Sequence, residues 1–293
     1  MTGKDTKFII FAPPIELMMK YNVIALIVIT LSVLSCSHGG EQRDPDSMRL
    51  GIVHPAKMIS SIPDTTLRFS PADYQTMYFD TEGRILKKVN YAPDGSPLNY
   101  ETCEYDDQHR LVSYDIYSMD GIYDGGFTFT YDGNMIATCT ACIPGDEETA
   151  KWINKNDGKH IIQTEFYSEG ELQYTSKDKY GKKGLVRDEE TINSDGECIG
   201  KMHYEYIAEE IPTLIRGGNR DVQVEYNEKL LPVRSSGAAI NSAGEVEWIV
   251  SKEDPVTYEY EYDDHGNWIV RSEYRGSRHR LTRLIRREIE YYQ

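Results

Sequence analysis

The chain has 293 residues, enough to bury a substantial core in one large domain or in two smaller ones. Its formal net charge is −16, which argues against binding nucleic acid or an anionic lipid surface, because both reward clustered Lys and Arg. Tyr is strongly over-represented, with 22 residues against 7 Phe and 3 Trp, and Tyr suits strands that have one solvent-exposed face.

An apolar, uncharged run occupies residues 23–34 and follows Lys20, which is the order of charge and apolar residues in a secretory signal. The run is too short for a transmembrane helix, which needs about 20 apolar residues. We therefore predict a signal peptide over residues 1–35 and export of the rest. Met18 or Met19 would be a more natural start than the first residue.

Val33, Ser35 and Cys36 resemble the lipobox of bacterial lipoproteins, whose cysteine is acylated, for example with palmitate. The resemblance implies a lipid anchor on Cys36 that holds the protein in the bacterial cell envelope. It also implies an outer-membrane location, with the periplasmic and the surface face both open. The alternative is a cleaved signal with an incidental cysteine. Residues 36–72 are then predicted to be the lipidated cysteine and a flexible linker.

A motif repeats along the rest of the chain. Phe79-Asp80-Thr81-Glu82-Gly83-Arg84-Ile85-Leu86 aligns without gaps to Tyr105-Asp106-Asp107-Gln108-His109-Arg110-Leu111-Val112, and the same step of 26 residues leads to Tyr131-Asp132. The pattern returns near the end of the chain as Tyr262-Asp263-Asp264-His265-Gly266-Asn267-Trp268-Ile269. Such Asp- and Gly-containing segments favour tight hairpin turns.

A second, offset turn signal lies between these motifs, at Asp94-Gly95 and again at Asp120-Gly121. Each unit therefore contains two turns and two strands, and stretches such as residues 258–262 alternate as strands do. Residues 281–289 fit either a helix face or a strand, and we favour a strand. The sequence predicts one all-β domain of repeats over residues 73–293.

These aromatic-Asp turns resemble the YD repeats of RHS-like proteins, and the tail of the chain resembles that of uncharacterised bacterial lipoproteins built from such repeats. The resemblance covers roughly residues 74–292. It implies an all-β, antiparallel meander of repeated β-hairpins that forms an open curved sheet or half-barrel. It supplies no catalytic residue.

Cysteine is the residue type that comes nearest to a chemical motif. Cys139-Thr140-Ala141-Cys142 is a Cys-x-x-Cys, but no second pair follows at the spacing of zinc ligands, and strand alternation places its two thiols on opposite faces. Structural disulfides or buried thiols explain Cys139, Cys142, Cys103 and Cys198 better than catalysis does. We therefore predict no metal, no cofactor and no enzymatic activity.

Repeated units create a broad, uniform surface, whereas catalysis needs one asymmetric cluster, so the sequence favours a binding or structural module with a glycan or a protein as its ligand. An inhibitor or immunity-type protein that binds a basic partner is the alternative, and a hydrolase of envelope polymers comes third. Packing within the sheet explains many of the same aromatic residues. The candidate binding surface comprises Tyr105, Tyr258, Tyr260, Tyr262 and Trp268.

Overall fold

The computed structural model describes residues 50, 52, 54–67, 73–182, 184–208, 211–217, 220–240, 246–248 and 255–293. Among these residues, no helix has the length and apolar character needed to cross a membrane. The predicted signal peptide and Cys36 lie outside the described residues. The strands are β1 Ala56–Pro63, β2 Gln75–Phe79, β3 Ile85–Tyr91, β4 Pro97–Tyr105, β5 Leu111–Ser118, β6 Tyr123–Asp132, β7 Met135–Ile143, β8 Asp146–Asn156, β9 Ile161–Ser168, β10 Glu171–Tyr180, β11 Val186–Asn193, β12 Cys198–Ala208, β13 Ile211–Gly217, β14 Arg220–Tyr226, β15 Pro232–Ser236, β16 Ala238–Ile240, β17 Val246–Trp248, β18 Val256–Tyr262, β19 Trp268–Arg275 and β20 Arg280–Tyr291.

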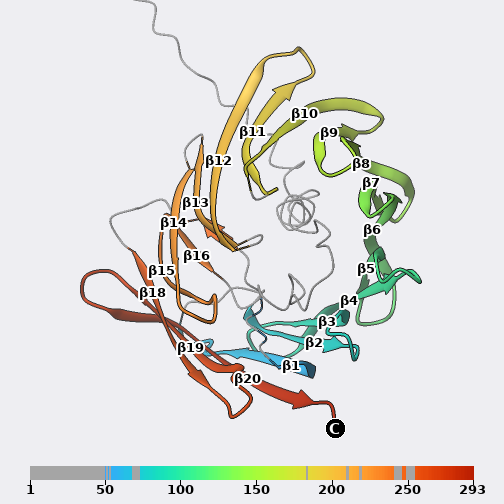
Figure 1. Cartoon of the computed structure of the whole chain (residues 1–293). Helices are drawn as coiled ribbons and strands as arrows, with labels where there is room; N and C mark the ends of the chain where they lie inside the picture. Colours follow the sequence, from blue (N-terminus) through green and yellow to red (C-terminus); the bar gives the residue numbers. More distant parts are fainter. Residues whose placement is uncertain are drawn as a thin grey trace, which may run out of the picture. The chain divides into compact units, whose positions relative to one another are not determined.

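Eighteen of these strands form one antiparallel sheet whose two ends meet (Figure 1). Consecutive strands pair from β1 to β15, β15 pairs with β18 past the small β16–β17 sheet, and β18, β19 and β20 follow in order. β1 then pairs with both β2 and β20. The all-β antiparallel meander predicted from the sequence is confirmed, and it is a closed barrel.

Two sequence predictions need correction here. The sheet is not open or half-closed, because β1 joins the first and last strands of the meander and leaves no free edge. That strand lies inside residues 36–72, the segment predicted to be a flexible linker, so the folded part starts earlier than residue 73. The sequence AKMISSIP of β1 carries no Asp-Gly turn of the repeat, which is why the pattern did not reveal it.

The repeated motif folds into the same turn in successive units. The Asp80 carboxylate accepts hydrogen bonds from the backbone N–H groups of Glu82 and Arg84, both at 2.9 Å, and Gly83 has a φ of 86°. Asp106 and Arg110 repeat this arrangement, although a histidine occupies the glycine position. The left-handed backbone that glycine favours is therefore part of the repeat.

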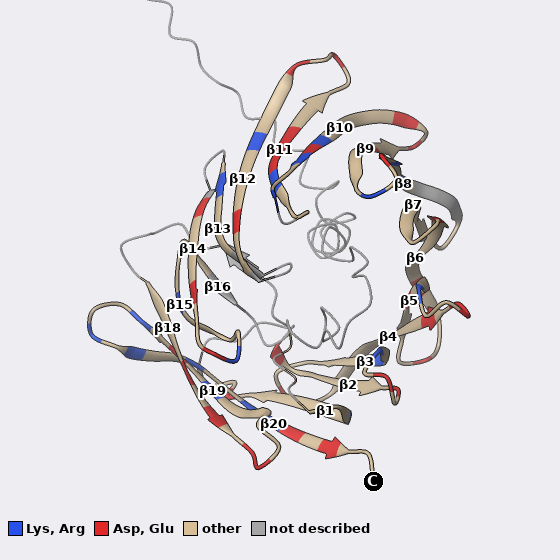
Figure 2. Ribbon diagram, in the orientation of Figure 1, with Lys and Arg blue, Asp and Glu red and all other residues tan. Residues whose placement is uncertain are grey.

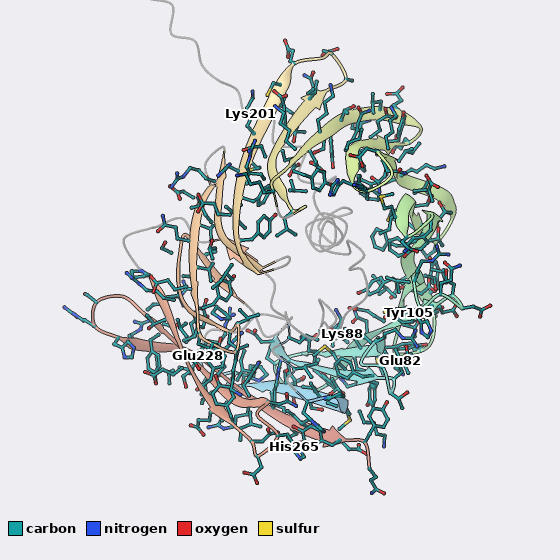
Figure 3. All side chains as sticks on the ribbon, in the orientation of Figure 1. Glu82, Lys88, Tyr105, Lys201, Glu228 and His265 are labelled. Atoms are coloured by element: carbon teal, nitrogen blue, oxygen red, sulfur yellow. The ribbon has the colours of Figure 1, made fainter. Side chains whose placement is uncertain are left out.

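A tyrosine joins each turn to the next unit. The Arg84 guanidinium pairs with Asp80 at 2.6 Å and lies over the ring of Tyr105, 5.0 Å from its centroid. The Tyr105 hydroxyl donates to the Ile85 carbonyl at 3.0 Å. Figure 3 labels Glu82 and Tyr105, which belong to these neighbouring units. Arg110, Tyr131 and Leu111 form the same set of contacts one unit later.

The sheet has a buried face and an exposed face. Along β6, Phe127 and Phe129 are 3% and 6% exposed, whereas Thr128 and Thr130, which alternate with them, are exposed. Cross-strand register carries this division from strand to strand, so residues such as Ile59, Trp152, Tyr258 and Ile285 share the buried face. Alternation with a period of two residues thus gives every strand one polar side.

Buried charges hold the closing strands together. Arg283 on β20 lies 3.1 Å from the Asp73 carboxylate and 3.7 Å from the Glu273 carboxylate on β19. Asp73, Glu273 and Arg283 are at most 1% exposed, so water does not stabilise these charges and each depends on the opposite charge beside it. Arg283 of β20 is therefore paired with acidic neighbours inside the barrel wall.

The chain before β1 is fastened to the last repeat. Trp268, which is 2% exposed, donates its ring N–H to the Leu50 carbonyl at 3.1 Å, and Arg287 donates to the same oxygen at 2.7 Å. The Arg287 guanidinium also lies 3.5 Å from the Trp268 ring centroid. Asn267 exchanges two hydrogen bonds with the backbone of His54. Residues far apart in sequence thus close the barrel.

Candidate functional site

Four of the five residues predicted to form a binding surface lie together. Tyr258, Tyr260, Tyr262 and Trp268 share the buried face of β18 and β19, where the Tyr260 ring lies edge-on to Trp268 at 6.1 Å. Tyr105 lies on β4, in a different part of the barrel.

The polar atoms of these residues are engaged within the fold. The Tyr260 hydroxyl donates to the Pro232 carbonyl at 2.8 Å, and the Tyr258 hydroxyl lies 3.2 Å from that of Ser235. Asn227 donates to the Tyr262 hydroxyl at 3.2 Å. Tyr258 is 4% exposed, so this group forms part of the core of the closing strands.

A second group of aromatic residues, which sequence reasoning missed, crosses the buried face from β5 to β10. Its ring centroids are 6.3 Å apart between Tyr114 and Phe127 and between Phe127 and Trp152, and 4.9 Å apart for the next two steps. Between β6 and β8, β7 contributes the small side chains that let these rings approach each other. We call this set the aromatic row; its members are Tyr114, Phe127, Trp152, Phe166 and Tyr174.

Two carboxyl groups continue the buried face beyond Tyr174. Asp178 on β10 and Glu189 on β11 are directly opposite each other in the cross-strand register. The Ser176 hydroxyl donates to one Glu189 oxygen at 3.0 Å, and the Tyr204 hydroxyl on β12 donates to the other at 2.9 Å. Both Glu189 oxygens thus accept a hydrogen bond from a hydroxyl group. We call Asp178 and Glu189 the carboxyl pair.

The two carboxyl groups therefore differ in their electrostatics. Burial, together with the negative charge of Glu189, raises the pKa of Asp178 to about 7. Burial and the same glutamate also raise the pKa of Tyr204. At neutral pH Asp178 is therefore partly protonated, so its carboxyl group can both donate and accept a hydrogen bond.

The chemistry open to this surface is recognition by stacking and hydrogen bonding. Phe166 and Tyr174 are half-buried, so parts of their rings stay accessible beside the carboxyl pair. In the described part of the chain, no group of three or more His, Cys, Asp or Glu side chains is placed to hold a metal ion.

No disulfide joins the described cysteines to one another. Cys139 faces Phe129 and Trp152 on the buried side, whereas Cys142 is opposite Gly126 on the exposed side, so the predicted separation onto two faces is confirmed. Burial raises the pKa of Cys139 to about 12, which leaves this thiol protonated and unreactive at neutral pH.

One sequence signal pointed toward the missed residues. Trp152, Phe166 and Tyr174 each lie in a strand of alternating residues, but their motifs lack the aromatic-Asp pair that marks the clearest repeats. The pairing of Asp178 with Glu189 depends on the β10–β11 register, which a bulge at the end of β10 helps to set.

No protein-family model and no curated protein matches this sequence. Among solved structures, a porin-like protein from Bacteroides uniformis is 14% identical, with 80% of this chain and 97% of that chain covered and a TM-score of 0.42. A porin-like protein from Bacteroides vulgatus is 13% identical over 81% and 98% of the two chains, with a TM-score of 0.33. The Photorhabdus luminescens Tc holotoxin pore is 10% identical over 75% of this chain and 16% of that chain, with a TM-score of 0.26.

Proposed function

We propose that this protein is a lipid-anchored binding module of the bacterial cell envelope, and that it holds a saccharide without converting it, on the carboxyl pair and on Phe166 and Tyr174 at the half-buried end of the aromatic row. The observation that carries the proposal is the continuity of these two groups on one face. Aromatic rings offer flat apolar faces to a sugar ring, and adjacent carboxyl and phenol groups satisfy its hydroxyls.

The proposed location at the membrane rests on the signal-like segment and on Cys36, together with the charged residues on the exposed face. Lys201 on β12 has 72% of its side chain exposed, and Glu225 on β14 has 64%. Lys57 on β1 and Glu290 on β20 are also about half exposed. A charge facing the middle of a bilayer costs about 2–4 kcal/mol, so such strands suit an anchored barrel in water.

The turn geometry supports a proposed relationship to the YD-repeat proteins. Successive units place an aspartate, a basic side chain and the next tyrosine in the same contacts, as Asp80, Arg84 and Tyr105 do. Successive repeats form one wide sheet, and we propose that this sheet carries the binding surface.

Binding is tested with the full chain purified from membranes in detergent. A glycan array would identify the saccharide class, and calorimetry would then measure its affinity for the wild type and for Phe166→Leu and Tyr174→Leu. Both variants keep an apolar side chain, so we expect folded proteins with at least tenfold weaker binding.

Tyr262→Leu, which alters an aromatic residue of the closing strands, is the matched control and should bind as the wild type does. The proposal fails if no saccharide binds or if the control variant loses affinity to the same extent.

The carboxyl pair gives a specific reason to test for hydrolysis as well. A carboxyl group with a raised pKa beside an ionised one is the arrangement that glycosidases use for general acid catalysis. We propose binding alone, because Ser176 and Tyr204 already occupy both oxygens of Glu189. Cleavage of the bound saccharide that disappears in both Asp178→Asn and Glu189→Gln would replace the binding module with a hydrolase.

A further inference from the structure

A second surface lies on the opposite side of the sheet, on the exposed face of β4, β5 and β6. Here Leu98, Met119 and Ile122 are 52%, 46% and 64% exposed. The β4–β5 register pairs Asn99 with Ser118, so Leu98 and Met119 are neighbours across the two strands. These side chains make no contribution to the core, and they form an apolar patch in water.

Stacked tyrosines extend this patch along the exposed face. The Tyr100 and Tyr117 rings are 5.1 Å apart and nearly parallel, with an interplanar angle of 13°. The Tyr123 ring meets Tyr117 edge-on at 5.7 Å. The Lys87 ammonium already lies 4.4 Å from the Tyr100 centroid, so these ring faces accept a cation.

Several acidic residues near the apolar patch form no ion pair with a described residue. Residues 111–150 contain seven Asp or Glu and no Lys, Arg or His. Asp120, Asp124 and Glu104 are exposed, and Asp115 lies beside Tyr117. Figure 2 marks acidic residues in red along this part of the ribbon. None of these four carboxylates forms an ion pair with another described residue. On β11 and β12, by contrast, Glu190 pairs with Lys201 at 2.9 Å and Asp188 pairs with Arg187 at 2.7 Å.

We propose that this surface docks a partner protein through a basic segment rich in aliphatic residues. Its apolar part would cover Leu98, Met119 and Ile122, and its Lys or Arg side chains would meet the unpaired carboxylates and the tyrosine faces. The inference goes beyond saccharide binding, because it concerns the other face of the sheet and a different class of ligand.

The test uses the full chain and two synthetic amphipathic helical peptides, one of Leu and Lys and one of Leu and Glu. The altered protein is Asp120→Asn/Ile122→Ser. Its matched control is Asp195→Asn/Ile199→Ser. This control changes another Asp-Gly turn and an isoleucine on β12 that is 61% exposed, and it lies away from the stacked tyrosines.

We expect the Leu-Lys peptide to bind the wild type and the control equally, to bind the Asp120→Asn/Ile122→Ser protein at least tenfold more weakly, and to weaken as salt is added. The Leu-Glu peptide should not bind. Circular dichroism melts confirm that both double variants stay folded.

Three outcomes would overturn the proposal. If both double variants bound the Leu-Lys peptide equally weakly, the attraction would be a diffuse one to an acidic protein. If the two peptides bound equally well, charge would play no part in recognition. Self-association of the full chain that Ile122→Ser abolishes would assign the surface to a second copy instead.

Discussion

The closing strands and the β10–β11 hairpin place charges on the same buried face but arrange them in opposite ways. In the closing strands Arg283 meets both Asp73 and Glu273, so these two buried acids have a partner of the other sign, while Arg271 and Arg287 pack against the Trp268 ring. In the hairpin Asp178 is opposite Glu189, and two acids share one site.

The difference separates a structural role from a candidate functional one. Paired opposite charges fix one arrangement of strands that lie far apart in sequence, and removing either partner leaves the other charge stranded. Facing carboxyl groups repel each other and weaken the fold when both ionise, so a ligand that donates hydrogen bonds to them gains affinity from the same feature.

The largest expected effect on stability comes from a substitution at Trp268 in the closing strands. Trp268→Ala removes a buried ring, its hydrogen bond to Leu50 and its contact with Arg287, and should lower the free energy of unfolding by about 4 kcal/mol in urea titrations. Trp268→Phe keeps the ring and should recover part of the loss. A change below about 1 kcal/mol in the alanine variant would contradict the role of this residue in closure.

A buried ion pair of the same region gives the next largest effect. Asp73→Asn removes one negative charge beside Arg283 and should destabilise the fold by about 3 kcal/mol. Asp195→Asn, at an exposed turn, is the control and should stay within about 0.5 kcal/mol of the wild type. Similar values for the two variants would show that the Asp73 charge is not needed for closure.

Removing a charge from the carboxyl pair is expected to stabilise the fold instead. Because the pKa of Asp178 is raised to about 7, the folded state binds its proton more tightly than the unfolded chain does, so the wild type loses stability as pH rises from about 4 to 7. Asp178→Asn should lack this loss. Above pH 7 it should be more stable than the wild type by about 2 kcal/mol, roughly half the unscreened value, because the side chain is partly exposed.

Denaturant titrations of both proteins at pH 4.5 and pH 8 would measure this difference. An equal effect of Asp178→Asn at the two pH values would argue against repulsion within the pair.

The smallest effect tests the link between repeats, which both regions share. Tyr105→Phe removes the hydrogen bond to the Ile85 carbonyl but keeps the ring beneath Arg84, and should cost about 1 kcal/mol. Tyr105→Ala loses the ring as well and should cost about 3 kcal/mol. If the two variants have the same melting temperature, the stacking of Arg84 on the ring contributes nothing.

The sequence predicted the antiparallel repeats because their turns are local. Asp80 and Gly83 are three positions apart, and the hydrogen bonds that define the turn join neighbouring residues. The strand over residues 281–289 was also correct, since it is part of β20. The surroundings of the predicted binding residues were not predictable in this way. Alternation places Tyr258 and Tyr260 on one face of the strand, but it does not show which groups their hydroxyls hydrogen-bond.

The sequence by itself determined the all-β class and the repeated hairpins, since each depends on residues close together in the chain. The tertiary structure alone decided that β1 closes the barrel and that Asp178 meets Glu189 beside an aromatic row. Those contacts depend on register accumulated over many strands and on a strand without a turn motif. A local pattern carries no information about either.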